Sequence, residues 1–191
     1  MVKHFNENVI KENMKHSFLC LLTVLCLSSF VSAQKINHPS LLYTPQRIQQ
    51  VKQRMQNEPK LQEAWEDIQK TADEALQKKD FNRLDYLSLA YLMTDNKEYA
   101  DVIKEILSKA VEAESWGDME MMARIPAWRS QLGMAHKSFL SAIGYDAAYN
   151  IMSSSERKKI AEGLKRLAVE PALGDWLLEP TRLQIYSPYE V

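Results

Sequence analysis

Hydrophobic residues recur along much of this chain at the three- and four-residue spacing of one face of an α-helix. The spacing is clearest over residues 128–152, which also contain small residues that suit close helix packing. The apolar positions in this segment are Leu132, Phe139, Leu140, Ile143 and Ala147. Ser153 lies three residues before Glu156, so the two side chains can each bind a backbone amide of the other at a helix start. We therefore predict a long helix over 128–152, a polar turn and a second helix over 155–169.

Further helices are predicted in the first half of the chain. Thr44 followed by Pro45 is typical of a helix start, because the threonine caps the helix and proline suits its first position. Pro59 begins another amphipathic segment. Residues 84–93 are apolar nearly all round, so we expect this helix to be buried on several sides. The next segment, 97–113, has the 3.6-residue hydrophobic period of a further helix.

These patterns predict an all-α fold of antiparallel helix hairpins. Only five glycines and seven prolines are present, and no run of alternating β-branched residues is found. Two expected hairpins pair 84–93 with 97–113 and 128–152 with 155–169. No repeat of fixed length is visible, which argues against a regular tetratricopeptide array but allows a looser helical toroid or solenoid. The segment 170–191 shows no sustained period.

The start of the chain has the pattern of a secretory signal peptide. Apolar residues fill most of 18–30, Lys15 and His16 precede them, and the sequence Val-Ser-Ala follows. The apolar run is shorter than the roughly 20 residues that a membrane-spanning helix needs. We predict a signal peptide over 1–33 and an exported protein, periplasmic or secreted, with no membrane attachment after cleavage. Met14 is an alternative start, and an uncleaved N-terminal anchor is the alternative interpretation.

The remaining residues, 34–191, form one domain of ordinary size. Both cysteines, Cys20 and Cys26, lie inside the predicted signal, so a packed core rather than disulfides must stabilise the domain. The formal net charge of the whole chain is −1, which gives no general attraction for nucleic acid. Binding of an acidic polymer would need a local cluster of arginine and lysine.

Two segments carry a resemblance to a known family. The first is HPSLLYT, with His38, Pro39, Leu41, Leu42 and Thr44, and the second is GYDAAYNIMSSSER, with Gly144, Tyr145, Asp146, Tyr149, Ser153, Glu156 and Arg157. Over residues 37–181 the chain resembles the N-terminal helical domain of heparinase II/III-type and alginate-lyase-type polysaccharide lyases. The resemblance implies that the antiparallel hairpins form part of an incomplete α/α toroid.

The resemblance also implies β-elimination on a uronic-acid-containing polysaccharide. That reaction needs a group that neutralises the uronate carboxylate, a base for the C5 proton and an acid for the leaving oxygen. In the family, a segment bearing asparagine and histidine follows the EPTR region, which is present here at 179–182, but no residue of this chain matches that segment. We therefore expect the N-terminal toroid portion of an exported lyase, truncated and with little or no activity.

Two alternatives to this interpretation remain open. The chain can instead be a non-catalytic helical module of a periplasmic glycan-utilisation system that binds a glycan or a protein. The unfinished toroid edge can also cause self-association of the chain. In each case the expected ligand is an acidic polysaccharide or oligosaccharide, and binding of nucleic acid is not expected.

Three residues are weak candidates for catalysis. Tyr145 and Tyr149 lie one helical turn apart and could present phenols to a cleft, although such pairs more often pack between helices. His136 is predicted to share the apolar face of the long helix, where a packed histidine is the more common outcome.

Four residues at the entry to the long helix are the candidates for polymer contact, because arginine binds carboxylate or sulfate and an aromatic ring stacks on sugar. They are Arg124, Trp128, Arg129 and Gln131. The alternative is an arginine pair that bridges to Asp118 and Glu120. No zinc-ligand spacing, phosphate loop or nucleophile triad is visible, so no metal or cofactor is expected.

Overall fold

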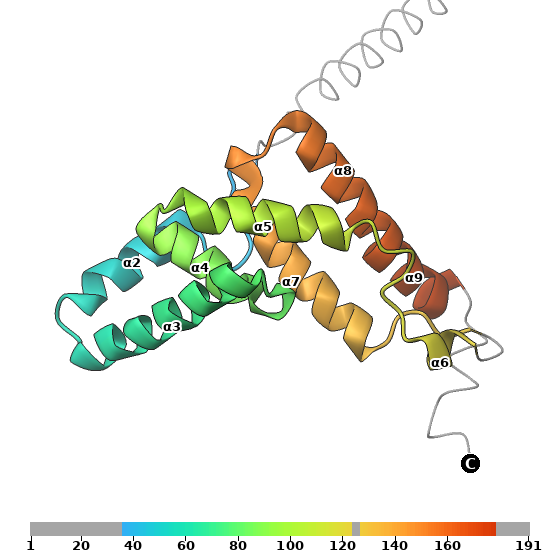
Figure 1. The fold of residues 1–191 in the computed structure, drawn as a ribbon, viewed down its shortest axis with the longest axis horizontal. Helices are drawn as coiled ribbons and strands as arrows, with labels where there is room; N and C mark the ends of the chain where they lie inside the picture. Colours follow the sequence, from blue (N-terminus) through green and yellow to red (C-terminus); the bar gives the residue numbers. More distant parts are fainter. Residues whose placement is uncertain (1–35, 124–126, 179–191) are drawn as a thin grey trace, which may run out of the picture. The chain divides into compact units, whose positions relative to one another are not determined.

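The computed structural model describes residues 36–123 and 127–178 of the chain. The chain divides into two compact units, Met1–Ile36 and Asn37–Val191. Within the described residues every regular element is a helix, which confirms the all-α prediction (Figure 1). The predicted signal over 1–33, Arg124 and the segment 179–182 lie outside the described residues.

The first two helices of the second unit begin at prolines, as predicted. Helix α2 spans Pro45–Met55, and the Thr44 side chain accepts a hydrogen bond from the backbone N–H of Arg47. Helix α3 spans Pro59–Lys78 and ends at Lys79, whose φ of 50° is left-handed and terminates the helix.

Helix α4, Leu84–Thr94, is the most buried helix of the unit. It follows the 3-10 turn η1, Phe81–Arg83, and packs against α3, against α5, Lys97–Ala110, and against α7, Leu132–Ala148 (Figure 1). Its buried residues point in several directions, and they are Leu84, Leu87, Ser88, Ala90, Tyr91 and Met93. This burial on several sides confirms the expectation drawn from the nearly continuous apolar run.

The long helix predicted over 128–152 is shorter in the structure. A one-turn helix α6, Met119–Met122, precedes α7, and the 3-10 turn η2, Tyr149–Ile151, follows it. Helix α8, Ser154–Leu164, begins with the predicted capping box of Ser153 and Glu156.

The predicted apolar face of α7 is wrong in part. Leu140, Ile143 and Ala147 are buried, but Leu132 is 90% exposed and Phe139 is 56% exposed. The buried face is displaced around the helix because α4 and α5 approach α7 most closely at its small residues. A Cβ at Gly144 would lie 3.3 Å from Leu84 Cδ2.

Residues 170–178, which show no sustained period in the sequence, are helical in the structure. Helix α8 continues through the π-helical turn η3, Lys165–Val169, into α9, Glu170–Leu173, and the second π-helical turn η4, Gly174–Leu178. Each π turn has more residues per turn than an α-helix, so the side chains after it point in a different direction around the helix axis. Buried positions therefore do not recur every 3.6 residues in this part of the sequence. Pro171 lies just after the π turn η3, and the helix continues there without the hydrogen bond that a backbone N–H at this position would donate.

The core of the second unit lies where α3, α4, α5, α7 and α8 meet. Its largest fully buried apolar side chains are Leu84, Leu87, Ile103, Leu107, Leu140, Ile160 and Leu167. None of the described helices is both long enough and apolar enough to cross a lipid bilayer.

Candidate functional site

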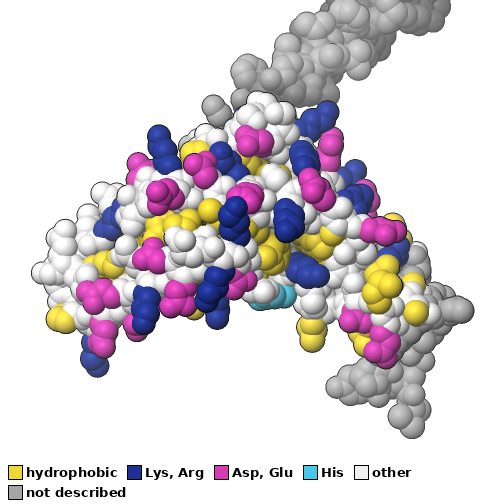
Figure 2. Space-filling view, viewed as in Figure 1, with side chains coloured by type: hydrophobic (Ala, Val, Ile, Leu, Met, Phe, Trp, Pro, Cys, Tyr) yellow, Lys and Arg dark blue, Asp and Glu magenta, His cyan; other side chains and the backbone are white. Residues whose placement is uncertain are grey.

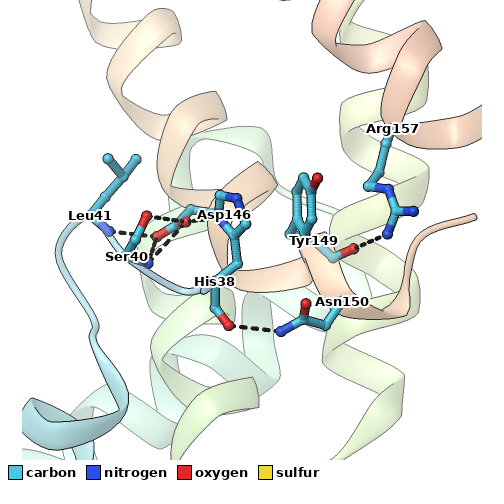
Figure 3. Close-up of polar contacts among 7 residues, drawn as sticks. All are labelled: His38, Ser40, Leu41, Asp146, Tyr149, Asn150 and Arg157. Carbon is cyan, nitrogen blue, oxygen red and sulfur yellow. Dashed lines mark hydrogen bonds and ion pairs between the residues drawn. The ribbon is translucent and has the colours of Figure 1, made fainter. Parts of the chain in front are cut away.

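The two segments that carry the family resemblance meet in the structure through one buried carboxylate (Figure 3). Asp146 Oδ2, near the end of α7, accepts hydrogen bonds from the backbone N–H groups of Ser40 and Leu41, each at 2.8 Å. His38 Nδ1 lies 2.5 Å from Asp146 Oδ1, and Asn150 Nδ2 donates to the His38 carbonyl at 2.7 Å. We call these five residues the leader clasp.

The leader clasp favours an ionised Asp146. Burial alone raises the pKa of this carboxyl, but the hydrogen bonds from Leu41, His38 and Ser40 outweigh the burial and hold the pKa below its ordinary value. The clasp therefore depends on a negative charge that is only 4% exposed to solvent.

The candidate catalytic tyrosines belong to the surroundings of the leader clasp. The ring of Tyr149 stacks on His38, with ring centres 3.8 Å apart, and the guanidinium of Arg157 lies 4.8 Å from the Tyr149 ring centre. The hydroxyl of Tyr145 donates to the Arg157 carbonyl at 3.4 Å, and burial raises the pKa of its phenol. Both tyrosines thus pack where the leader joins α7.

A second buried carboxylate holds the segment before α7 in the same way. Asp175, in η4, accepts hydrogen bonds from the backbone N–H groups of Arg129 and Ser130, each at 2.7 Å. The Arg129 guanidinium adds bonds of 3.0 and 2.9 Å, and the Ser130 hydroxyl adds one of 3.0 Å. Burial raises the pKa of Asp175, but these hydrogen bonds hold it below its ordinary value. We call Arg129, Ser130 and Asp175 the Asp175 clasp.

The remaining candidates from the sequence do not converge on a cavity. Trp128 lies edge-to-face with Trp176, with ring centres 6.4 Å apart. The Gln131 amide nitrogen is buried without a hydrogen-bond partner among the described residues. His136 is exposed on α7. Their roles, like that of Arg129 in polymer contact, stay predictions.

The structure places a different set of residues around a cavity of about 610 Å³, a size typical of small-ligand sites. Four lysines border it, and they are Lys78, Lys79, Lys109 and Lys137. Apolar side chains that are buried or half-buried line it as well, and they are Phe81, Ile106, Ala110, Ala113 and Trp116. Glu105 and Ser115 complete the lining. We call this cavity the lysine pocket.

Three helices bring the lysines together. Lys78 and Lys79 lie at the end of α3, and Lys109 lies in the last turn of α5, where positive charge also stabilises the negative end of the helix dipole. Lys137 has no such role, because it lies in the second turn of α7 and is half-buried. The rings of Phe81 and Trp116 meet edge-to-face at 6.4 Å behind this border.

Two of the four ammonium groups have partners in the described part of the chain. Lys79 Nζ lies 2.6 Å from Glu105 Oε1, and Lys78 Nζ lies 3.8 Å from Glu74 Oε2. Lys109 and Lys137 form no hydrogen bond or salt bridge with another described residue. Figure 2 shows hydrophobic side chains at the surface between charged ones on the face that carries α5. Free cations beside an apolar wall suit an anionic ligand that also has an apolar face.

Among the described residues that line the lysine pocket, none is a tyrosine, a histidine or an asparagine. The described residues also contain no cluster of three or more histidine, cysteine, aspartate or glutamate side chains that could hold a metal ion.

Sequence reasoning missed the lysine pocket because its lysines lie far apart along the chain. The available signal was the pair Lys78 and Lys79 at the end of one helix and Lys109 at the end of another.

Comparison of the chain with protein-family models, with curated proteins and with solved structures found no match.

Proposed function

We propose that this chain is the helical, glycan-binding portion of an exported polysaccharide lyase that acts by β-elimination on uronic-acid-containing polysaccharide. The observation that carries the proposal is the lysine pocket, in which Lys109 and Lys137 form no hydrogen bond or salt bridge with another described residue and lie beside an apolar wall. The family resemblance of the HPSLLYT and GYDAAY segments supports the lyase assignment.

A uronate sugar suits the lysine pocket in both charge and shape. Its carboxylate can pair with the ammonium groups of Lys109 and Lys137, and its C–H face can lie against Phe81. The attraction is local, because a formal net charge of −1 on the chain provides no long-range pull on a polyanion. We therefore expect binding to weaken as salt screens these exposed charges.

We propose that the described residues bind the glycan without cleaving it. Among the described residues that line the pocket, none supplies a phenol or imidazole for the C5 proton, and Tyr145 and Tyr149 are engaged beside the leader clasp. The same observation favours a second candidate function, a non-catalytic module of a periplasmic glycan-utilisation system. Sequencing the transcript beyond the Val191 codon separates the two, since a continuation bearing the asparagine and histidine segment supports the lyase.

The binding site is tested by removing its two unpaired lysines. We expect Lys109→Ala with Lys137→Ala to weaken binding of an unsulfated oligouronate roughly tenfold, because each surface ion pair contributes up to about 1 kcal/mol. Isothermal titration calorimetry at low salt measures the affinity, and circular dichroism verifies the fold. Absorbance of unsaturated uronate, recorded on the same mixtures, is expected to stay flat.

The matched control is Lys60→Ala with Lys70→Ala, which removes two exposed lysines of α3 that do not line the pocket. This control should retain the affinity of the unaltered protein. An equal loss in both double variants, or no binding by the unaltered protein, contradicts the proposed site. A clear rise in absorbance contradicts the absence of cleavage.

A further inference from the structure

Glu105 places a negative charge among the lysines of the lysine pocket. Its carboxylate lies on α5 and is 2.6 Å from Lys79 Nζ, at the end of α3. Among the described residues that line the pocket it is the single acid, so three lysine charges remain in excess. We infer that Glu105 is a specificity-determining residue that reduces the preference of the pocket for sulfated over unsulfated uronate glycans. This inference rests on the proposed function.

The position of Glu105 is one that a ligand anion would otherwise take. The carboxylate pairs with Lys79, and Glu74 outside the pocket pairs with Lys78, so Lys109 and Lys137 are the cations most available to a ligand. Both members of the pair are about half exposed, with side-chain exposures of 53% for Lys79 and 55% for Glu105. A glycan that enters the pocket therefore meets Glu105 at the surface.

The two classes of glycan meet Glu105 differently. An unsulfated uronate carries one carboxylate on each sugar, and its hydroxyl groups can donate hydrogen bonds to a carboxylate oxygen. A sulfated glycan carries further negative charges on the same sugars, and these are repelled by Glu105. Two like charges at close range repel each other even in bulk water. Glu105 thus penalises each sulfate more than it penalises a hydroxyl.

A purely structural role for the Lys79–Glu105 pair predicts a different outcome. The pair joins the end of α3 to α5, but a salt bridge this exposed contributes little to stability. Glu105→Gln keeps the shape of the side chain and its ability to accept a hydrogen bond. The variant should therefore fold, and only its ligand preference should change.

The test compares two ligands of equal length on each variant. An unsulfated oligouronate and a sulfated heparin oligosaccharide are titrated into the unaltered protein and into Glu105→Gln. We expect the ratio of the two affinities to move roughly tenfold toward the sulfated ligand in Glu105→Gln, because the carboxylate that repels sulfate is removed. Glu63→Gln, an exposed acid of α3 outside the pocket, is the control and should leave the ratio unchanged.

The outcomes separate this inference from the proposed function. If the unaltered protein binds neither ligand, the proposed function and the inference both fail. If the lysine variants lose binding but Glu105→Gln leaves the ratio unchanged, the proposed function stands and the inference is wrong. A ratio that moves equally in Glu63→Gln also overturns the inference, because it then reflects net charge rather than the pocket.

Discussion

Asp146 and Asp175 use the same device at the scale of single residues. Each carboxylate is nearly fully buried and accepts hydrogen bonds from two consecutive backbone N–H groups of a segment that precedes a helix. Backbone amides just before a helix lack partners within it, and a buried amide without a partner costs free energy. The two aspartates thus hold in place the segments that lead into α2 and α7.

Asp146→Asn should destabilise the protein by roughly 1–3 kcal/mol at pH 7, because an amide leaves part of the leader clasp unsatisfied. The folded-state pKa of Asp146 lies below its unfolded value, so its contribution to stability is present above that unfolded value, about 4. The contribution is lost as the pH falls through the folded-state pKa. Urea unfolding at several pH values measures the difference between the two proteins.

The difference between Asp146→Asn and the unaltered protein should therefore shrink below about pH 4. Asp67→Asn, at an exposed position of α3, is the control and should change the free energy of unfolding little. A difference that grows on acidification would show that Asp146 is not held as a carboxylate.

The contacts that could be predicted from the sequence are those between residues close together in the chain. The capping box of Ser153 and Glu156 spans three residues, so its pattern is visible in the sequence and is confirmed. The contact between Ser40 and Asp146 spans 106 residues, and no local pattern reveals it. The lysine pocket also depends on how three helices pack, which the sequence alone did not show.

At the scale of helices, α8 passes very close to the end of α5. A Cβ built at Gly163 would lie 2.4 Å from Val111 Cβ, closer than two such atoms can approach. The guanidinium of Arg166 lies one turn further along and donates to the carbonyls of Val111 and Ala113, at 2.8 and 3.0 Å. Arg166 thereby satisfies carbonyl groups that the end of α5 leaves open.

Gly163→Ala should destabilise the protein by roughly 1–3 kcal/mol, because the added methyl group must push α8 away from Val111. Gly133→Ala is the matched control, since a Cβ there meets nothing within 4 Å. Alanine is the better helix former, so the control should gain up to about 1 kcal/mol. Thermal unfolding of both variants measures the difference, and similar effects in the two would rule out a tight crossing at Gly163.

The helices were predictable where the 3.6-residue period is continuous. The starts of α2, α3 and α8 follow from caps and prolines, and all three are confirmed. The segment after residue 169 shows no sustained period in the sequence because two π turns interrupt the period of a helix that continues to Leu178. The buried face of α7 depends on its neighbours, which periodicity does not identify.

At the scale of the whole described unit, α7 is held at both ends. The Asp175 clasp binds the backbone just before its first residue, Leu132, and the leader clasp binds Asp146 near its last residue, Ala148. A helix of 17 residues is about 25 Å long, so the two clasps share no partner. The toroid arrangement and self-association of the chain stay predictions. Both depend on contacts that this unit would make with other helices or with a second copy of the chain.

Asp146→Asn and Asp175→Asn should therefore act independently. We expect the loss of unfolding free energy in the double variant to equal the sum of the single losses to within about 0.5 kcal/mol, as for sites without shared contacts. Denaturant unfolding of the four proteins measures the coupling, provided that each unfolds in one transition. A larger coupling would mean that α7 moves as a body when either clasp is lost.

The leader clasp also sets an order of events for the nascent chain. Asp146 is synthesised 106 residues after Ser40, which at about 5–20 residues per second is a delay of roughly 5–20 s. Throughout that delay the amides of Ser40 and Leu41 have only water as a partner. Attachment of the leader therefore awaits translation of α7, so the first-made segment of this unit is among the last to reach its folded position.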